Sequence, residues 1–251
     1  MLRPINIITL KVGSKYSSVY VNRLYNSIKR NSTVDFNFYC YTEDQEVLDK
    51  DIIIVPIEDP LEFKLQWHKL KFHQEGFGGI PNGEKCLILD IDWIITGEMD
   101  DILLYPLPPK HFGCFKRWWS NRLDDCMING GFQMFYMGDT DYLWQTFSSN
   151  PGHWQEHYIN IGEAKGPVNG EQNFIDQHVI QDRSWFPMEW FAKYNDEEIV
   201  KIQYNWQTIV GKDEPYYLGG EFDECIKMVH FSNADNNMEL IKDQWINNFW
   251  Y

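Results

Sequence analysis

Apolar and polar residues alternate in blocks along the first half of the chain, and each block has the length of one strand or one helix. Residues 5–10 form a mostly apolar run that predicts a strand. After a turn rich in Gly and Ser, Val21, Leu24, Tyr25 and Ile28 recur at the spacing i, i+3, i+4, i+7. This spacing places the four side chains on one face of a helix. The chain therefore opens with a strand and an amphipathic helix.

Similar patterns predict the remaining elements. Strands are expected over 36–41, 52–55, 86–90, 111–116, 132–137 and 226–232, and helices over 63–74, 139–147, 171–180 and 238–249. Strands that alternate with helices indicate an α/β fold with a mostly parallel, Rossmann-like central sheet flanked by helices. The second half has a more mixed order. No internal repeat or linker divides the chain, so we expect a single domain over residues 1–251.

Charge and hydropathy narrow the classes of partner. The net charge of −15 at pH 7 argues against nucleic acid and against an anionic membrane surface, because phosphates attract basic surfaces. No apolar run is long enough for a membrane span. The apolar run at the N-terminus is too short for a signal peptide, so we interpret it as the first strand.

The five cysteines lie at positions 40, 86, 114, 126 and 225. Their spacing is typical neither of a metal site nor of a disulfide framework. Cys40 and Cys86 fall inside apolar runs, where a reduced, buried thiol is expected. A cytoplasmic protein fits this use of cysteine.

The segment CLILDIDWIIT, residues 86–96, places Asp90 and Asp92 at the end of an apolar strand. Chance alone predicts roughly 1.6 Asp-x-Asp pairs in a chain with this many Asp, so the motif needs context. The pairs at 49/51 and 139/141 fall in a charged turn and at a helix start, where acidic side chains are ordinary.

Asp90 and Asp92 instead follow a strand that looks central, at the end where parallel sheets bind their ligands. In extended backbone, residues i and i+2 point to the same side, so both carboxylates can converge on one object. Carboxylate oxygens suit Mg²⁺ or Mn²⁺ with bound phosphates. A helix cap or a surface ion pair is the alternative interpretation.

Five segments in order resemble one enzyme family. They are KLKFHQ, KCLILDIDWIITGEMDDIL, MINGGFQMFYMGD, GEQNFI and MVHFS. Together they resemble the nucleotide-sugar-dependent glycosyltransferases of the GT-A fold, and the branch with glycogenin and bacterial glycan galactosyltransferases in particular. Each motif is short, so their order across most of the chain carries the resemblance.

The resemblance implies a role for each matching residue. Asp90, Asp92 and His230 match the ligands of Mn²⁺ or Mg²⁺. Lys69 matches a lysine that approaches the donor phosphates. The nucleotide, the diphosphate and the donor sugar are expected at Thr9, Leu10, Tyr16, Asp44, Asp90, Ile91, Asn129 and Gly130. Glu171 and Gln172 fall where the family has an Asp-Gln pair near the reacting sugar, so Asn129, Glu171 and Gln172 are the catalytic candidates.

The implied function is a metal-dependent hexosyltransferase. It moves a sugar from a nucleotide-diphosphate donor, with UDP favoured, to a hydroxyl acceptor such as a glycan, and the family pattern favours retention of anomeric configuration. Residues 1–105 approximately would form the nucleotide-binding half and residues 106–251 the acceptor-binding half. The chain departs from the family at Glu171, at the second residue of the NGG segment, and after His230, where SNADNNMELIKD replaces a Gly and Lys-Pro-Trp segment.

Three alternatives stay open. A nucleotidyltransferase shares the nucleotide half of the fold, although LKVGSKYSS is a poor match to its phosphate loop. A non-catalytic nucleotide-sugar binding module is consistent with the change at Glu171. HWQEH, residues 153–157, matches the His-x-x-Glu-His pattern of a zinc protease. That segment is rich in Gly and Pro, and we expect it to have room for barely two helical turns.

Overall fold

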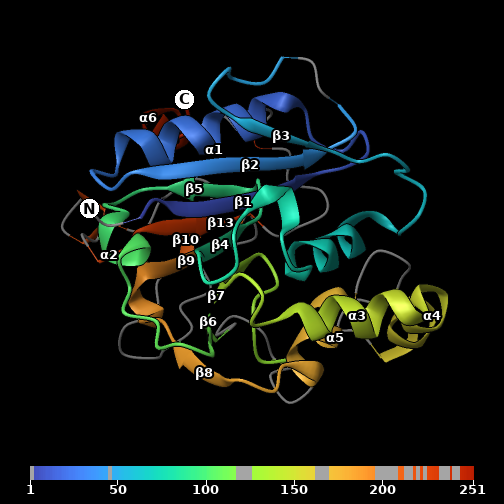
Figure 1. Cartoon of the computed structure of the whole chain (residues 1–251). Coiled ribbons are helices and arrows are strands. Elements are labelled where there is room, and N and C mark those ends of the chain that lie inside the picture. The colour runs from blue at the N-terminus through green and yellow to red at the C-terminus, as the bar shows by residue number, and fades with distance from the viewer. Residues whose placement is uncertain are drawn as a thin grey trace.

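Seven strands form the main sheet, in the order β3-β2-β1-β4-β7-β6-β8. The computed structural model describes residues 3–44, 47–116, 126–161, 170–195, 209–211, 217–218, 221–222, 225–231, 238 and 244–251 (Figure 1). The strands are β1 (Ile5–Lys11), β2 (Phe36–Thr42), β3 (Ile53–Pro56), β4 (Lys85–Leu89), β6 (His111–Cys114), β7 (Phe132–Tyr136) and β8 (Asp182–Trp185).

Strand β7 runs against the direction of the other strands in this sheet. The strands β3, β2, β1 and β4 are parallel to one another. Strand β7 is antiparallel to both β4 and β6, and β8 is parallel to β6. The prediction of an α/β fold with a mostly parallel central sheet and a mixed second half is confirmed.

A second, smaller sheet has the order β10-β9-β13-β5. Its strands are β5 (Trp93–Ile95), β9 (Phe191–Asn195), β10 (Ile209–Gly211) and β13 (Met228–His230), and a separate hairpin pairs β11 (Tyr217–Leu218) with β12 (Glu221–Phe222). Strand β5 closely follows β4 in the chain, so the acidic turn 90–92 joins the two sheets. Because β5 pairs with β13, the late segment 225–231 lies beside this turn.

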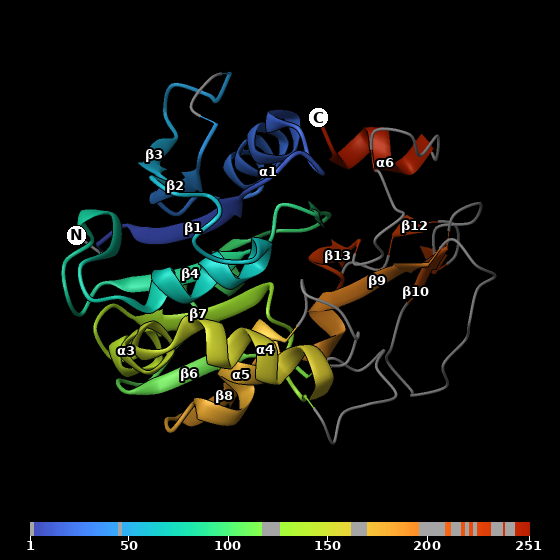
Figure 2. The same cartoon turned by 90° about the vertical axis from the view of Figure 1, so that its right-hand side faces the viewer.

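Helices cover both faces of the main sheet, and the alternation of side chains along the strands supplies a core to each face. On β4, Leu87 and Leu89 pack on the side of α1, whereas Cys86 and Ile88 pack on the opposite side. The α1 side holds α1 (Ser18–Arg30), α2 (Asp100–Leu103) and α6 (Gln244–Phe249). The opposite side holds η1 (Leu65–His73), η2 (Phe77–Gly79), α3 (Asp141–Ser149), α4 (Pro151–Ile161) and α5 (Glu171–His178) (Figure 2).

Two helical segments differ from expectation. The predicted helix over 63–74 is a 3₁₀ helix, and Trp67, Leu70 and His73 recur at its three-residue period, each buried. The expectation of barely two turns near 150–162 is wrong, since α4 has 11 residues. Pro151 is its first residue, a position where proline costs no hydrogen bond. The short η3 (Met188–Trp190) precedes β9.

The C-terminal expectations are met in part. Residues 244–249 of the predicted terminal helix are helical, and 239–243 lie outside the described residues. The predicted late strand is shorter than expected and ends at His230. Among the residues that the structure describes, no helix is both long and apolar enough to cross a membrane.

Candidate active site

The acidic pair lies in a tight turn between the two sheets. Asp90 follows Leu89, the last residue of β4, and its backbone N–H donates to the carbonyl oxygen of Gly131 at 3.0 Å. Ile91 is buried in the core on the α1 side, so it contributes packing, and only its backbone is available to a ligand. The backbone at 90–92 is a turn and not the extended segment that we expected. The two carboxylates nevertheless converge at the carboxyl end of β4.

Strand pairing brings His230 to this turn. Strand β13 is antiparallel to β5 with His230 opposite Trp93, and the Phe231 N–H donates to the Asp92 carbonyl oxygen at 3.1 Å. The imidazole Nε2 lies 3.6 Å from Asp92 Oδ1. One potential ligand atom from each of Asp90, Asp92 and His230 lies within 4.8 Å of the others. This is the only group of three or more potential metal-ligating side chains found within the described part of the chain.

Lys69 supplies a buried positive charge from η1. Its Nζ lies 2.6 Å from Asp90 Oδ1 and 3.3 Å from Glu171 Oε1, and its side chain is 6% exposed. Burial alone lowers the pKa of Lys69, but the charges of Asp90 and Glu171 outweigh burial and raise it overall. Burial raises the pKa of Glu171, and Lys69 opposes this shift. The ammonium group is therefore held charged between two carboxylates.

Asp92 carries the least compensated charge of the cluster. Burial, and then repulsion from Asp90, raise the pKa of Asp92 to about 7, although Lys69 and Lys15 act in the opposite direction. The Tyr16 hydroxyl lies 3.4 Å from Asp92 Oδ2. Burial and the charges of Asp92 and Asp90 raise the pKa of Tyr16, so this hydroxyl stays protonated and donates.

The residues of the cluster fit a divalent cation. Asp92 Oδ1 is buried and accepts no hydrogen bond from the described residues. A buried carboxylate oxygen in this state is stabilised by a cation. Two carboxylates and one imidazole are ligands that Mn²⁺ accepts, and Mg²⁺ shares the preference for oxygen.

The Asn129-Gly130-Gly131 segment leads into β7 and packs directly against the cluster. The Gly131 N–H donates to Asn129 Oδ1 at 2.8 Å, and the Gly130 N–H donates to Gln172 Oε1 at 3.2 Å. A Cβ atom at position 131 would overlap the Asp90 carboxylate. A Cβ atom at position 130 would lie 2.7 Å from Gln172 Cβ and 2.9 Å from Glu171 Oε1. The two glycines thus allow β7 to approach the acidic turn and the start of α5.

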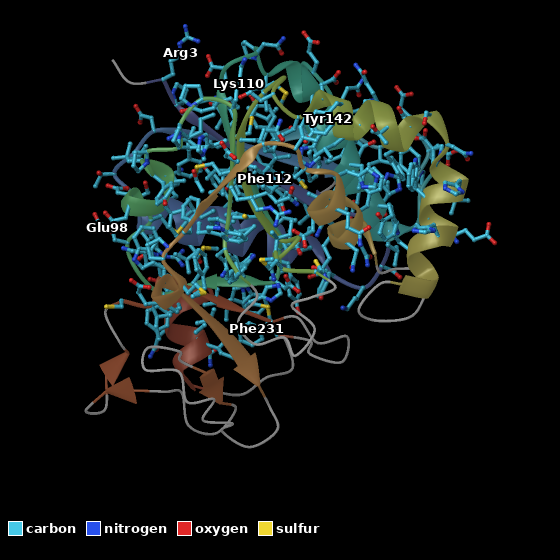
Figure 3. The ribbon with its side chains drawn as sticks, turned by 90° about the horizontal axis from the view of Figure 1, so that it is seen from below. Arg3, Glu98, Lys110, Phe112, Tyr142 and Phe231 are labelled. Atoms are coloured by element: carbon cyan, nitrogen blue, oxygen red, sulfur yellow. The ribbon has the colours of Figure 1, made fainter. Side chains whose placement is uncertain are left out.

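The expected nucleotide residues lie at the carboxyl ends of β1 and β2. Thr9 is buried, and its hydroxyl donates to the Leu89 carbonyl oxygen at 2.7 Å, next to Asp90. Leu10 is buried beneath η1, in the core on the face of the main sheet opposite α1. Asp44 Oδ2 lies 3.2 Å from Nζ of the buried Lys11. These residues lie at the same end of the parallel strands as the acidic turn. In Figure 3, Phe231, next to His230, lies on the opposite side of the molecule from Arg3, which precedes β1.

The structure does not assemble the zinc-protease pattern into a site. His153 and His157 lie on successive turns of α4 with ring centroids 6.0 Å apart, and both are exposed. Glu156 is also exposed, and no third ligand joins the two imidazoles among the described residues.

Sequence reasoning missed two residues that contact the cluster. Trp93 packs on His230 with ring centroids 4.4 Å apart, and the carboxylate of Asp90 lies against Gly131. The sequence carries a local signal for each. Trp93 directly follows the Asp-x-Asp motif, and the double glycine marks a close backbone approach. Tyr16, one of the residues expected at the donor nucleotide, points its hydroxyl at Asp92.

The sheet order, the acidic turn after β4 and the returning β13 agree with the GT-A fold expected from the sequence. No protein-family profile matches the chain, and no curated protein sequence matches it. Solved structures do match, and among them are the glycosyltransferases LgtC and GlyE.

The chain is similar to the galactosyltransferase LgtC in complex with donor and acceptor sugar analogues. The TM-score is 0.58 at 12% identity, over 91% of this chain and 87% of LgtC. An active-site mutant of LgtC gives a TM-score of 0.56 at 11% identity. The glycosyltransferase GlyE of Streptococcus pneumoniae TIGR4 gives 0.54 at 12% identity, and the match covers 74% of this chain but 46% of GlyE. At these identities the likeness establishes the fold.

Proposed function

We propose that this chain is a metal-dependent glycosyltransferase that moves a sugar from a UDP-sugar to a hydroxyl group of a glycan. The observation that carries the proposal is the Asp90–Asp92–His230 cluster at the carboxyl end of β4, with Lys69 beside it. Ligands of open α/β sheets bind at this edge. LgtC, which shares the fold, binds a donor and an acceptor sugar analogue, and such substrates agree with a site of this chemistry.

The residues of the site have different roles in sugar transfer. Asp90, Asp92 and His230 would hold a Mn²⁺ or Mg²⁺ ion, which would supply positive charge for the leaving nucleoside diphosphate. Lys69 stands beside the same carboxylate and adds a second positive charge where negative charge develops. Thr9, Leu10, Tyr16, Asp44 and Ile91 form the edge for the nucleotide. Asn129, Gly130, Glu171 and Gln172 frame the donor sugar.

Retention of anomeric configuration is part of the proposal. An inverting reaction requires a free general base near the acceptor. Of the described carboxylates at the cluster, Asp90 and Glu171 are paired with Lys69, and Asp92 is assigned to the cation. Glu171 therefore holds Lys69 in position and does not act as that base. Proton NMR of the anomeric position in the product distinguishes the two outcomes.

Turnover of nucleotide sugars tests the function. The protein is incubated with UDP-glucose, UDP-galactose or UDP-N-acetylglucosamine, with Mn²⁺ or with EDTA, and the release of UDP is measured. We expect release that requires Mn²⁺ and is lost in Asp92→Asn. Asp51→Asn is the matched control, because it alters another Asp-x-Asp pair that lies on the surface. Release that persists in EDTA would contradict the proposal.

The same experiment separates the alternative functions. Mn²⁺-dependent binding of UDP-sugars without turnover would indicate a binding module. Consumption of a nucleoside triphosphate and a sugar phosphate, with release of pyrophosphate, would indicate a nucleotidyltransferase.

We further propose a single catalytic domain in the cytoplasm. Residues 1–105 approximately form the nucleotide half and 106–251 the acceptor half, and the pairing of β5 with β13 links the two. Cys40, Cys86 and Cys114 are buried free thiols, which suit a reducing compartment. Limited proteolysis that yields one stable fragment spanning both halves would support the single domain.

A further inference from the structure

Trp93 is the first residue of β5 and directly follows the acidic turn. Its side chain is fully buried. The indole contacts the cluster in two ways: its ring lies on the imidazole of His230, with centroids 4.4 Å apart and planes inclined by 39°, and its Nε1–H donates to the Gly131 carbonyl oxygen at 2.9 Å. The Trp93 side chain therefore contacts both His230 and Gly131, the residue that precedes β7 and lies beside Asp90.

The Gly131 carbonyl oxygen joins Trp93 to Asp90. The same oxygen accepts the Asp90 backbone N–H at 3.0 Å. Gly131 also lies so close to the Asp90 carboxylate that a Cβ atom at position 131 would overlap the carboxylate. A shift of the indole would therefore move the backbone against which Asp90 rests.

Trp93 lies in a cluster of aromatic rings. Phe115 and Phe191 make edge contacts with the indole, each with a ring centroid 6.0 Å away, and these two phenyl rings stack on each other at 4.0 Å. Backbone pairing aligns Trp93 with His230 across β5 and β13. The aromatic cluster thus fixes the indole, and the indole limits the positions that the imidazole can take.

We propose that Trp93 is a positioning residue for the metal site, which it preorganises by holding His230 and the Gly131–Asp90 contact in a single geometry. This inference rests on the proposed metal-dependent function. Residues that orient metal ligands raise affinity because the ligands need not be ordered when the ion binds. The effect of Trp93 should therefore appear in metal affinity, apart from catalysis.

The test measures the dissociation constant of Mn²⁺ from the EPR signal of the free ion, at a temperature well below unfolding. Trp93→Phe keeps an aromatic face for His230 but loses the Nε1–H donor, and we expect affinity about tenfold weaker than that of wild type. Trp93→Leu loses both contacts, and we expect a loss approaching roughly 100-fold.

The matched control is Trp250→Phe. Trp250 is also buried, and among the described residues its ring packs on Tyr20 and under Arg23 and on none of the three proposed metal ligands. The Trp250→Phe variant should be less stable than wild type, as expected when a buried tryptophan is replaced. Its Mn²⁺ affinity should stay within about twofold of wild type. Circular dichroism at the same temperature verifies that each variant is folded, and if Trp93→Leu does not fold, Trp93→Phe decides the outcome.

Three results would overturn the inference, and they are distinguishable. If wild type binds Mn²⁺ and Trp93→Phe binds it equally well, Trp93 has no positioning role and the proposed function stands. If wild type binds no Mn²⁺, the metal site and the role of Trp93 fail together. If Trp93→Phe and Trp250→Phe weaken Mn²⁺ binding equally, the loss reflects a general effect of packing. This result would also contradict the inference.

Discussion

Lys69 Nζ lies 2.6 Å from Asp90 Oδ1, and the same ammonium group lies 3.3 Å from Glu171 Oε1. The side chains of Lys69 and Glu171 are each 6% exposed. One buried cation therefore links the acidic turn after β4 to the first residue of α5. Because charge removed from water is costly when unpaired, each of the three groups depends on the other two.

Lys69→Met should destabilise the protein. The change leaves Asp90 and Glu171 close together without a cation, and breaking such a buried arrangement costs about 3–5 kcal/mol. Urea unfolding measures the loss. Lys69→Arg, which keeps the charge, should recover part of it. Lys29→Met removes an exposed lysine that pairs with Asp51 and should be nearly neutral. A nearly neutral Lys69→Met would contradict the role of Lys69 as a buried counter-ion.

Asp92→Asn should stabilise the metal-free protein at pH 8 and abolish its response to Mn²⁺. The charged carboxylate is buried beside Asp90, so its removal relieves desolvation and repulsion, and we expect a gain of roughly 1–3 kcal/mol. Thermal unfolding with EDTA and with Mn²⁺ measures both effects. Asp51→Asn is the control and should leave the Mn²⁺ shift unchanged. Asp92→Asn that retains the wild-type Mn²⁺ shift would remove Asp92 from the metal site.

Gly131→Ala should distort the acidic turn at residues 90–92 and destabilise the protein. The added Cβ atom overlaps the Asp90 carboxylate, so the turn or β7 must move, and overpacking of this kind costs about 1–3 kcal/mol. The Mn²⁺-induced rise in unfolding temperature should fall as well. Gly152→Ala is the control, since open space surrounds that glycine near the start of α4. It should be neutral or slightly stabilising. A Gly131→Ala protein with an unchanged Mn²⁺ shift would show that Asp90 tolerates displacement.

His73 should make the protein less stable in acid. Burial lowers the pKa of His73 to about 3, whereas an imidazole in the unfolded chain titrates near 6.5. Between these values the unfolded state binds a proton that the folded state does not. Stability therefore falls as the pH falls through this window, by about 2 kcal/mol from this group between pH 7 and pH 5.

Replacement of the imidazole isolates this contribution. The difference in unfolding free energy between wild type and His73→Gln, measured in urea, should narrow by about 2 kcal/mol from pH 7 to pH 5. Phe147→Leu alters the core on the same side of the sheet without a titrating group, and its difference from wild type should not depend on pH. A pH-independent difference for His73→Gln would show that His73 is not buried as a neutral imidazole.

Local patterns in the sequence predict most elements of the fold. The residues of α1 recur at helical spacing because one face packs on the sheet, and β4 is a continuous apolar run because helices cover both of its faces. The 3₁₀ geometry of η1 escapes prediction, since nearly all its side chains from Trp67 to His73 are buried and no exposed face marks an α-helical period. The length of α4 is underestimated because Pro151 and Gly152 resemble helix breakers, although they lie at its start.

For the site, the sequence by itself determined the chemical groups, their order and their place at the carboxyl ends of strands. It placed Asp90 and Asp92 after a buried strand because such runs encode burial locally. Only the tertiary structure decided that β13 pairs with β5 in the register that puts His230 opposite Trp93, and that Lys69 faces both Asp90 and Glu171. Register and ion pairing between distant segments depend on the packing of the whole core and on the cost of burying charge, which no local pattern of residues records.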